Sequence, residues 1–418
     1  MVTLLAAAGV LVAVFVGFNI GGSSTGVAFG PSVGSRLVRK VTAATLFTGF
    51  ALVGAWTVGR NVIDTMSTSI VPAAQFSPVA SVGVLFFTGT SLLVSNLYGV
   101  PASTSMTAVG AIVGLGLATG TLNEALMFTI VSAWIVAPLV GFVCGAVVGR
   151  YVYPYLDRRI AFTRFDSHLI RLDRSGTVPR PRFNANASAR DIVGSATVVL
   201  IACYMGFSAG ASNAANAVAP LVGTEGPLTV DQGVLLAVFA FGLGGFTIAR
   251  RTLDTVGDDI TELPILAALI VSVVGGTIIT VLSTLGIPAS LAVSTTCCII
   301  GLGWGRASRA ATVVELATPA SRQEQELDLD VSTGALVTSR AEDAPTSPTV
   351  GDLARGEAPP EQPDEELPDV PEIGEKEPAE LDRRSLFDPS AVKRIAMLWV
   401  LTPTLAVAGS YPLFLVVL

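Results

Sequence analysis

The feature that most constrains this chain is a series of about ten apolar stretches, each long enough to cross a lipid bilayer. A helical crossing needs about 20 consecutive, mainly apolar residues, and soluble domains do not repeat such stretches at short intervals. The composition agrees, because 51% of the residues are hydrophobic and 14% are charged. We therefore expect an all-α integral membrane protein.

The stretches divide into two sets of five. The first set comprises residues 2–33, 41–59, 76–97, 101–118 and 125–148, and the second comprises 192–218, 233–248, 264–282, 287–304 and 395–418. Because each set has an odd number of crossings, the second set enters the membrane in the opposite sense. The prediction is therefore two inverted five-helix repeats.

The charged residues lie mainly between the predicted spans. We expect a first repeat at 1–150, a basic cytoplasmic linker at 151–190, four spans at 191–305, an acidic disordered cytoplasmic loop at 306–390 and a last span at 391–418. The acidic loop is rich in Pro, Glu and Asp and cannot bury enough apolar area to offset chain entropy. Basic residues flanking spans tend to remain in the cytoplasm, which places both termini outside the plasma membrane and the long loops inside.

Other classes of protein have little support in the sequence. The four cysteines lack CxxC spacing, and the single histidine, His168, lies in a basic loop, so neither a zinc site nor a disulfide framework is indicated. No segment assembles a nucleophile, a base and an orienting group, so we expect neither an enzyme nor a cofactor. The expected surroundings are the lipid bilayer and not nucleic acid, and assembly into a homo-oligomer is left open.

Two kinds of motif occur once in each half. A glycine- and serine-rich segment reads GGSSTGVAFGPSVGS at 21–35 and GASNAANAVAPLVG at 210–223, and a Gly-x-Pro-Ala-Ser sequence follows at 99–103 and at 286–290. Each is predicted to interrupt an apolar helix. Breaks in a membrane helix persist where they line a cavity or bind a ligand, since lipid cannot satisfy the freed backbone groups.

The residue types at these breaks suit a tetrahedral anion. Half-helix N-termini carry partial positive charge and free N–H groups, and hydroxyls add further donors. The candidate substrate-binding residues are Ser23, Ser24, Ser103, Thr104 and Ser105 in the first half, and Ser290, or Ser294 with Thr295 and Thr296, in the second. Asn213 and Asn216, with Ser212, are candidates for Na⁺ coordination as well as for substrate.

These segments resemble the duplicated signature of the PiT-type inorganic phosphate transporters, a family of sodium- or proton-dependent phosphate permeases. Its members carry two copies of a sequence close to GANDVANAFGTSVGS and a PVSTTH-like segment in each repeat. The two glycine-rich segments are similar to the signature copies, and PASTSMTAVGAIVG is similar to the first serine-threonine segment. The resemblance covers nearly all predicted spans, and it implies phosphate transport coupled to Na⁺ or H⁺. Some relatives carry sulfate.

The chain departs from the signature at the Asn-Asp pair, which is replaced by Ser23 and Ser24 and by Ser212 and Asn213. The later Asn is retained as Asn216 but is Val27 in the first half. The loss of both aspartates removes the hardest oxygen ligands for a cation, so the coupling ion is left open. In the second half extra residues separate the proline from the Ser-Thr-Thr sequence, so Ser290 and Ser294 are alternatives for one binding role.

The leading hypothesis is a secondary phosphate transporter that works by alternating access and is coupled to Na⁺. The first alternative is a sulfate permease on the same scaffold, because both anions are tetrahedral. The second is a passive anion channel, or a receptor that signals through the acidic loop.

Overall fold

A computed structural model describes residues 2–35, 37–97, 103–159, 170–173, 180–183, 189–222, 227–249, 265–317 and 389–417. The chain divides into one compact unit of Met1–Ser308 with Asp382–Leu418 and a second unit of Arg309–Leu381. The first unit contains nearly all of the described helices. Most of the predicted acidic loop at 306–390 lies outside the described residues.

The first half of the chain is helical. Its long helices are α1 (Val2–Gly34), α2 (Lys40–Thr57), α4 (Pro78–Leu97), α5 (Thr104–Thr119) and α6 (Glu124–Val147). Shorter helical segments are α3 (Gly59–Asp64), η1 (Thr65–Ser69), η2 (Ala73–Gln75), η3 (Val148–Val152) and α7 (Tyr153–Arg159). Local signals set some of the ends: the Asn123 side chain caps α6, and Gly120, with φ of 66°, terminates α5 in the left-handed conformation that glycine favours.

The second half contains α8 (Ala189–Val218), η4 (Ala219–Leu221), α9 (Val230–Thr247), α11 (Ile265–Thr284), α12 (Leu291–Ala317) and α16 (Pro389–Val417). Thr229 and Gln232 form a capping box that starts α9. Helix α12 continues to Ala317, past the predicted boundary at residue 305.

The helix surfaces are apolar on the outside as well as in the core. Leu4, Phe128 and Val416 are exposed by 74%, 76% and 86%, whereas Phe29 and Phe241 are buried. Five described helices are long and apolar enough to cross a membrane, or up to six if the bent pair of Lys40–Thr57 and Gly59–Ser69 is one span. Three further apolar helices are shorter. The structure therefore has the helices of a multi-pass membrane protein, and the predicted number of ten spans is not reached by this criterion.

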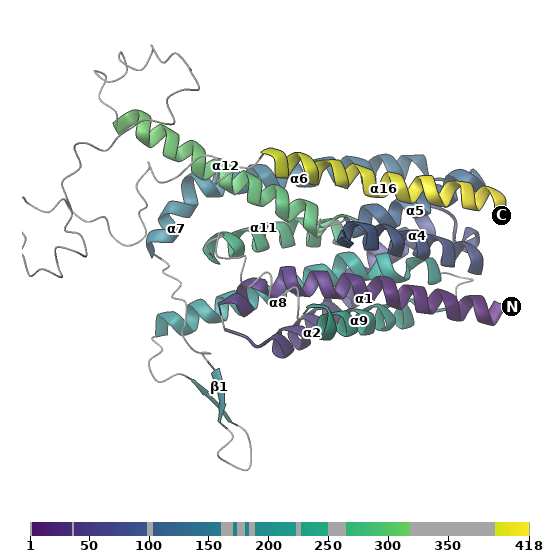
Figure 1. Cartoon of the computed structure of the whole chain (residues 1–418), viewed down its shortest axis with the longest axis horizontal. Helices are drawn as coiled ribbons and strands as arrows, with labels where there is room; N and C mark the ends of the chain where they lie inside the picture. Colours follow the sequence, from purple (N-terminus) through teal and green to yellow (C-terminus); the bar gives the residue numbers. More distant parts are fainter. Residues whose placement is uncertain are drawn as a thin grey trace, which may run out of the picture. The chain divides into compact units, whose positions relative to one another are not determined.

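The packing of the helices is reciprocal between the two halves (Figure 1). Helix α1 packs on α9, and α2 packs on α8. Helix α1 also packs on α4, as α8 packs on α11. Helix α5 lies against α16, and α6 lies against α12 through close contacts such as Gly145 with Cys298. The halves are thus interleaved, because the first helix of each contacts the second helix of the other.

The expectation of an all-α chain missed one element. Strands β1 (Ile170–Asp173) and β2 (Arg180–Phe183) form a two-stranded antiparallel sheet with Ile170 opposite Phe183. This hairpin lies inside the basic linker at 151–190, for which no strand was predicted.

The predicted interruptions at the two glycine-rich segments are wrong. Helix α1 runs without a break through 21–34, and α8 runs without a break to Val218. A Cβ atom at Gly21 would overlap the backbone of Phe241 in α9, and one at Gly210 would overlap the backbone of Ala51 in α2. These glycines therefore permit close helix packing and do not break the helices.

A break does occur at the second Gly-x-Pro-Ala-Ser sequence. Helix α11 ends at Thr284, Gly286 has a φ of 71°, and α12 begins at Leu291. In the first half α4 ends at Leu97 and α5 begins at Thr104, while residues 98–102 lie outside the described part of the chain. Helices α5 and α12 consequently both begin inside the helical unit, one residue after a Ser.

Candidate oxyanion site

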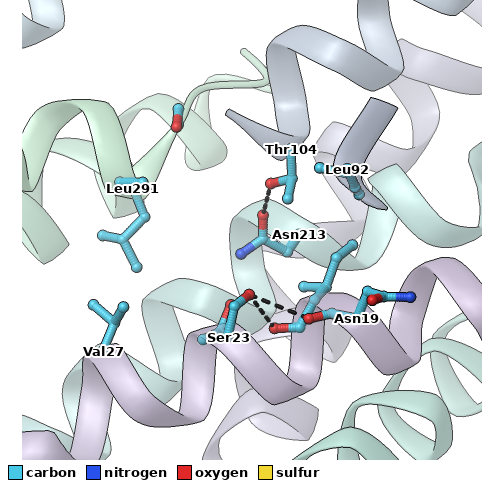
Figure 2. Close-up of a pocket in the computed structure, with 11 residues that line it drawn as sticks. Asn19, Ser23, Val27, Leu92, Thr104, Asn213 and Leu291 are labelled. Atoms are coloured by element: carbon cyan, nitrogen blue, oxygen red, sulfur yellow. Dashed lines mark hydrogen bonds between the residues drawn. The ribbon is translucent and has the colours of Figure 1, made fainter. Parts of the chain in front are cut away.

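A cavity lies where these two helix N-termini meet α1, α4 and α8. It contains about 640 Å³ of empty space, which includes space open to solvent. The lining residues are Asn19, Ile20, Ser23, Ser24, Val27, Leu92, Thr104, Asn213, Ser290, Leu291 and Ala292. Figure 2 shows seven of them labelled around the opening.

The N-terminus of α5 forms one wall. The Ser103 hydroxyl accepts a hydrogen bond from the backbone N–H of Met106 at 3.3 Å, which satisfies one of the free donors of the first turn. Thr104 follows it and lines the cavity. The hydroxyl of Ser105 donates to the backbone carbonyl of Ala289 at 2.9 Å, which ties α5 to the segment before α12.

Helix α8 supplies two asparagines one turn apart. The Thr104 hydroxyl donates to Asn213 Oδ1 at 2.8 Å. Asn216 Nδ2 lies 3.1 Å from Asn213 Oδ1, 3.1 Å from Ser105 Oγ and 3.3 Å from Thr104 Oγ1. Asn216 Oδ1 is buried and has no hydrogen-bond partner among the described residues. Asn213 therefore faces the cavity, and Asn216 lies behind it.

Helix α1 forms the opposite wall (Figure 2). Asn19, Ser23 and Val27 are spaced four residues apart, so they share one face of the helix. The Ser23 hydroxyl donates to the backbone carbonyls of Asn19 and Ile20, and Asn19 Nδ2 donates to the carbonyl of Phe15. These bonds to the helix's own backbone are the usual arrangement for Ser inside a helix.

The N-terminus of α12 closes the cavity with one polar and two apolar residues. The Ser290 hydroxyl accepts a hydrogen bond from the N–H of Val293 at 3.3 Å and thus caps α12 as Ser103 caps α5. Leu291 and Ala292 follow at the positions that Thr104 and Ser105 have in α5. In Figure 2 the side chains of Leu291 and Val27 point toward one another. This side of the cavity is therefore mainly apolar.

A tryptophan supports the break before α12. Trp134 Nε1 in α6 donates to the carbonyl oxygen of Pro288 at 2.8 Å. That carbonyl lies where no helical hydrogen bond is available, so the indole N–H replaces a backbone donor. The contact joins the last helix of the first half to the break in the second.

The predicted site residues fall into three groups. Those that line the cavity are Ser23, Ser24, Thr104, Asn213 and Ser290. Those directly behind it are Ser103, Ser105 and Asn216. Ser212, Ser294, Thr295 and Thr296 are not among the described lining residues, and Thr295 donates its hydroxyl to the carbonyl of Leu291.

The sequence pattern did not single out Asn19, Ile20, Leu92, Leu291 or Ala292 as lining residues. Asn19 had a usable signal, because it precedes Ser23 by one helical turn and so shares its face. The apolar residues carried no such signal, since Leu is the ordinary residue of a membrane helix.

Apolar helices of membrane-spanning length, arranged around a cavity lined by both polar and apolar side chains, are the features of a multi-pass membrane transporter. The sequence model of the phosphate transporter family matches residues 20–410, and the chain belongs to that family.

Relatives and a solved structure agree with this membership. The chain is 30% identical to the sulfate permease CysP of Bacillus subtilis, over 72% of this chain and 77% of the relative. It is 24% identical to a putative phosphate permease of Chlamydia pneumoniae, over 71% and 88%. Its fold is similar to that of a solved sodium-dependent phosphate transporter, with a TM-score of 0.62, 17% identity and coverage of 99% and 98%. These comparisons are consistent with the expectation that the chain is not an enzyme.

Proposed function

We propose that this protein is a secondary transporter that moves an inorganic tetrahedral oxyanion, phosphate or sulfate, across the plasma membrane. The observation that carries the proposal is the meeting of the α5 N-terminus with Asn213 of α8 at an internal cavity. Helix N-termini, hydroxyls and amide N–H groups are donors that suit an oxyanion. The family description also names phosphate.

The proposed binding residues are Thr104, Asn213, Ser24 and Ser290, since all four have polar side chains at the cavity. Ser103, Ser105 and Asn216 would position them, and Ser23 would take part through its hydroxyl oxygen. None of the eleven described lining residues is charged, so the anion would be held by dipoles and hydrogen bonds.

Alternating access would use two inverted repeats, residues 1–150 and 191–305 with 391–418. The reciprocal packing of α1 with α9 and of α2 with α8 supports this arrangement. Two inverted halves can exchange conformations, so that the cavity opens first to one side and then to the other. By the distribution of basic residues, both termini would lie outside and the long loops in the cytoplasm.

Coupling to Na⁺ is the finer part of the proposal. Thr104 Oγ1, Ser105 Oγ and Asn213 Oδ1 lie around the amide nitrogen of Asn216, while the amide oxygen of Asn216 is buried and has no partner among the described residues. Neutral amide oxygens can coordinate Na⁺ at a membrane site, and a cation beside Asn216 Oδ1 would satisfy this unpaired oxygen. The nitrogen of Asn216 lies 3.3 Å from Thr104 Oγ1, so the cation and anion sites would be adjacent.

Sulfate is the second candidate substrate. Two observations favour it: the sulfate permease of Bacillus subtilis is a relative at 30% identity, and the cavity has no carboxylate among its described lining residues. Sulfate has the same tetrahedral shape and uses the same kind of donors.

Uptake into proteoliposomes tests the proposal. Purified protein should accumulate radiolabelled phosphate or sulfate when an inward Na⁺ gradient is imposed, and a pH gradient alone should drive less uptake. Preloaded unlabelled anion should accelerate entry of labelled anion, because a carrier exchanges substrate. Conductance without such counterflow would indicate a passive channel. Absence of any oxyanion movement would refute the proposed function.

A further inference from the structure

The cavity presents hydrogen-bond donors and has no strong acceptor. Asn213 Oδ1 already accepts bonds from the Thr104 hydroxyl at 2.8 Å and from Asn216 Nδ2 at 3.1 Å. A carbonyl-type oxygen has two lone pairs, so little accepting capacity is left. The Nδ2 group remains, and in Figure 2 the nitrogen of Asn213 points away from Thr104. Asn213 therefore offers N–H donors to a ligand.

The other lining residues add no carboxylate. The eleven described residues of the cavity comprise two asparagines, three serines, one threonine and five apolar residues, and none is Asp or Glu. The remaining side-chain oxygens of these residues belong to neutral hydroxyls and to the amide of Asn19. Bonds to a charged acceptor are about twice as strong as bonds between neutral groups, so a ligand proton finds only weak partners here.

This difference matters because tetrahedral oxyanions differ in protonation. Sulfate and selenate carry no proton near neutral pH, and every oxygen accepts hydrogen bonds. Phosphate and arsenate carry at least one hydroxyl at the same pH, and this group needs an acceptor. Burying a ligand hydroxyl without a good acceptor costs free energy of binding. A ligand oxygen that faces N–H and O–H donors carries no such cost.

We propose that the cavity selects oxyanions by their protonation, favouring sulfate and selenate over phosphate and arsenate, with Asn213 and Ser24 as the specificity-determining residues. The inference rests on the proposed function, since it names the substrate class of the same site. Asn213 matters because it stands where the similar signature has Asp, so that an amide replaces a carboxylate of nearly the same shape. Ser24 lies on helix α1, lines the cavity and is partly exposed, so its side chain can be enlarged with little effect on the core.

Competition in proteoliposomes tests the wild-type preference. Uptake of labelled sulfate at neutral pH is measured against unlabelled sulfate, selenate, phosphate and arsenate. We expect selenate to compete as sulfate does, and phosphate and arsenate to need about tenfold higher concentrations or more. Equal or stronger competition by phosphate and arsenate would overturn the inference while leaving an oxyanion carrier. If none of the four anions moves, the proposed function itself fails.

Two variants test whether Asn213 and Ser24 determine the preference between anions. Asn213→Asp and Ser24→Asp each introduce an acceptor that also repels an unprotonated dianion, so each should raise the ratio of phosphate to sulfate uptake about tenfold. Ser24→Asn is the matched control, because Asn and Asp have the same shape, and it should keep the wild-type order of preference. Ser24→Asp serves alone if Asn213→Asp is not recovered as folded protein. An unchanged ratio in the folded Asp variants, or the same shift in Ser24→Asn, would overturn the assignment.

Discussion

The hydroxyl of Thr104 donates a hydrogen bond to the amide oxygen of Asn213 across 2.8 Å, and this bond joins the first turn of α5 to the C-terminal part of α8. The two residues are 109 positions apart in the chain. One comes from the first predicted repeat and the other from the second. Under the proposed function, a substrate bound here would contact both halves at once, as alternating access between them requires.

Thr104→Val should weaken substrate binding. The change keeps the shape of the side chain but removes the bond to Asn213, so we expect roughly a tenfold rise in the substrate concentration that gives half-maximal uptake. Thr104→Ser should restore most of the loss. Thr129→Val, on an exposed face of α6, removes a comparable hydroxyl and should leave uptake unchanged. Wild-type uptake by folded Thr104→Val would exclude Thr104 from the site.

Asn216→Ala should reduce the dependence of uptake on Na⁺. The variant removes the amide that contacts Thr104, Ser105 and Asn213, together with the buried oxygen that a cation would use. We expect the Na⁺ activation curve to shift to higher concentration by about tenfold. Asn61→Ala removes an exposed amide that bonds to the Thr284 carbonyl, and it is the control. An unshifted Na⁺ curve would exclude Asn216 from cation binding.

Gly21→Ala should destabilise the protein, because the added methyl overlaps the backbone of Phe241. Overpacking of this kind costs about 1–3 kcal/mol. Gly49→Ala is the matched control within α2, since a Cβ there has no atom within 4 Å, and alanine favours the helix over glycine by about 1 kcal/mol. Thermal unfolding in detergent measures both. A Tm for Gly21→Ala equal to or above that of Gly49→Ala would contradict the close packing of α1 on α9.

Trp134→Phe should loosen the break before α12. The substitution keeps an aromatic ring but removes the indole N–H that bonds to the Pro288 carbonyl, with an expected loss of about 1 kcal/mol in stability. Trp304→Phe alters a ring that is 52% exposed and should have a smaller effect. Thermal unfolding and substrate affinity are measured together. Equal behaviour of the two variants would show that the Trp134 bond does not support the site.

Most of the helical architecture was predictable from hydropathy. Long runs of apolar residues in a membrane protein can only be helices, because every backbone polar group must be satisfied within the segment. The ends of α1 and α5 were therefore close to the predicted ones. The hairpin of β1 and β2 was not predicted, although IRLD and RPRF both alternate apolar and polar residues, because strands of four residues are too short to stand out in a hydropathy pattern.

The glycine-rich segments misled the prediction because glycine has two uses in membrane helices. It can end a helix, or it can let two helices approach closely. The contacts of Gly21 with Phe241 and of Gly210 with Ala51 come from residues far apart in the chain, and only these contacts decide between the two uses.

The sequence by itself determined that the protein is a helical membrane protein, with a Pro-Ala-Ser segment before a helix in each half of the chain, because hydropathy and turn chemistry are local properties. Only the tertiary structure decided that Ser290, rather than Ser294, reaches the cavity, and that Asn213 faces Thr104. It also decided that Leu291 and Val27 point toward one another and make their side of the cavity apolar. These relationships depend on the rotation of each helix against neighbours from the other half, and such packing is not encoded in any single segment.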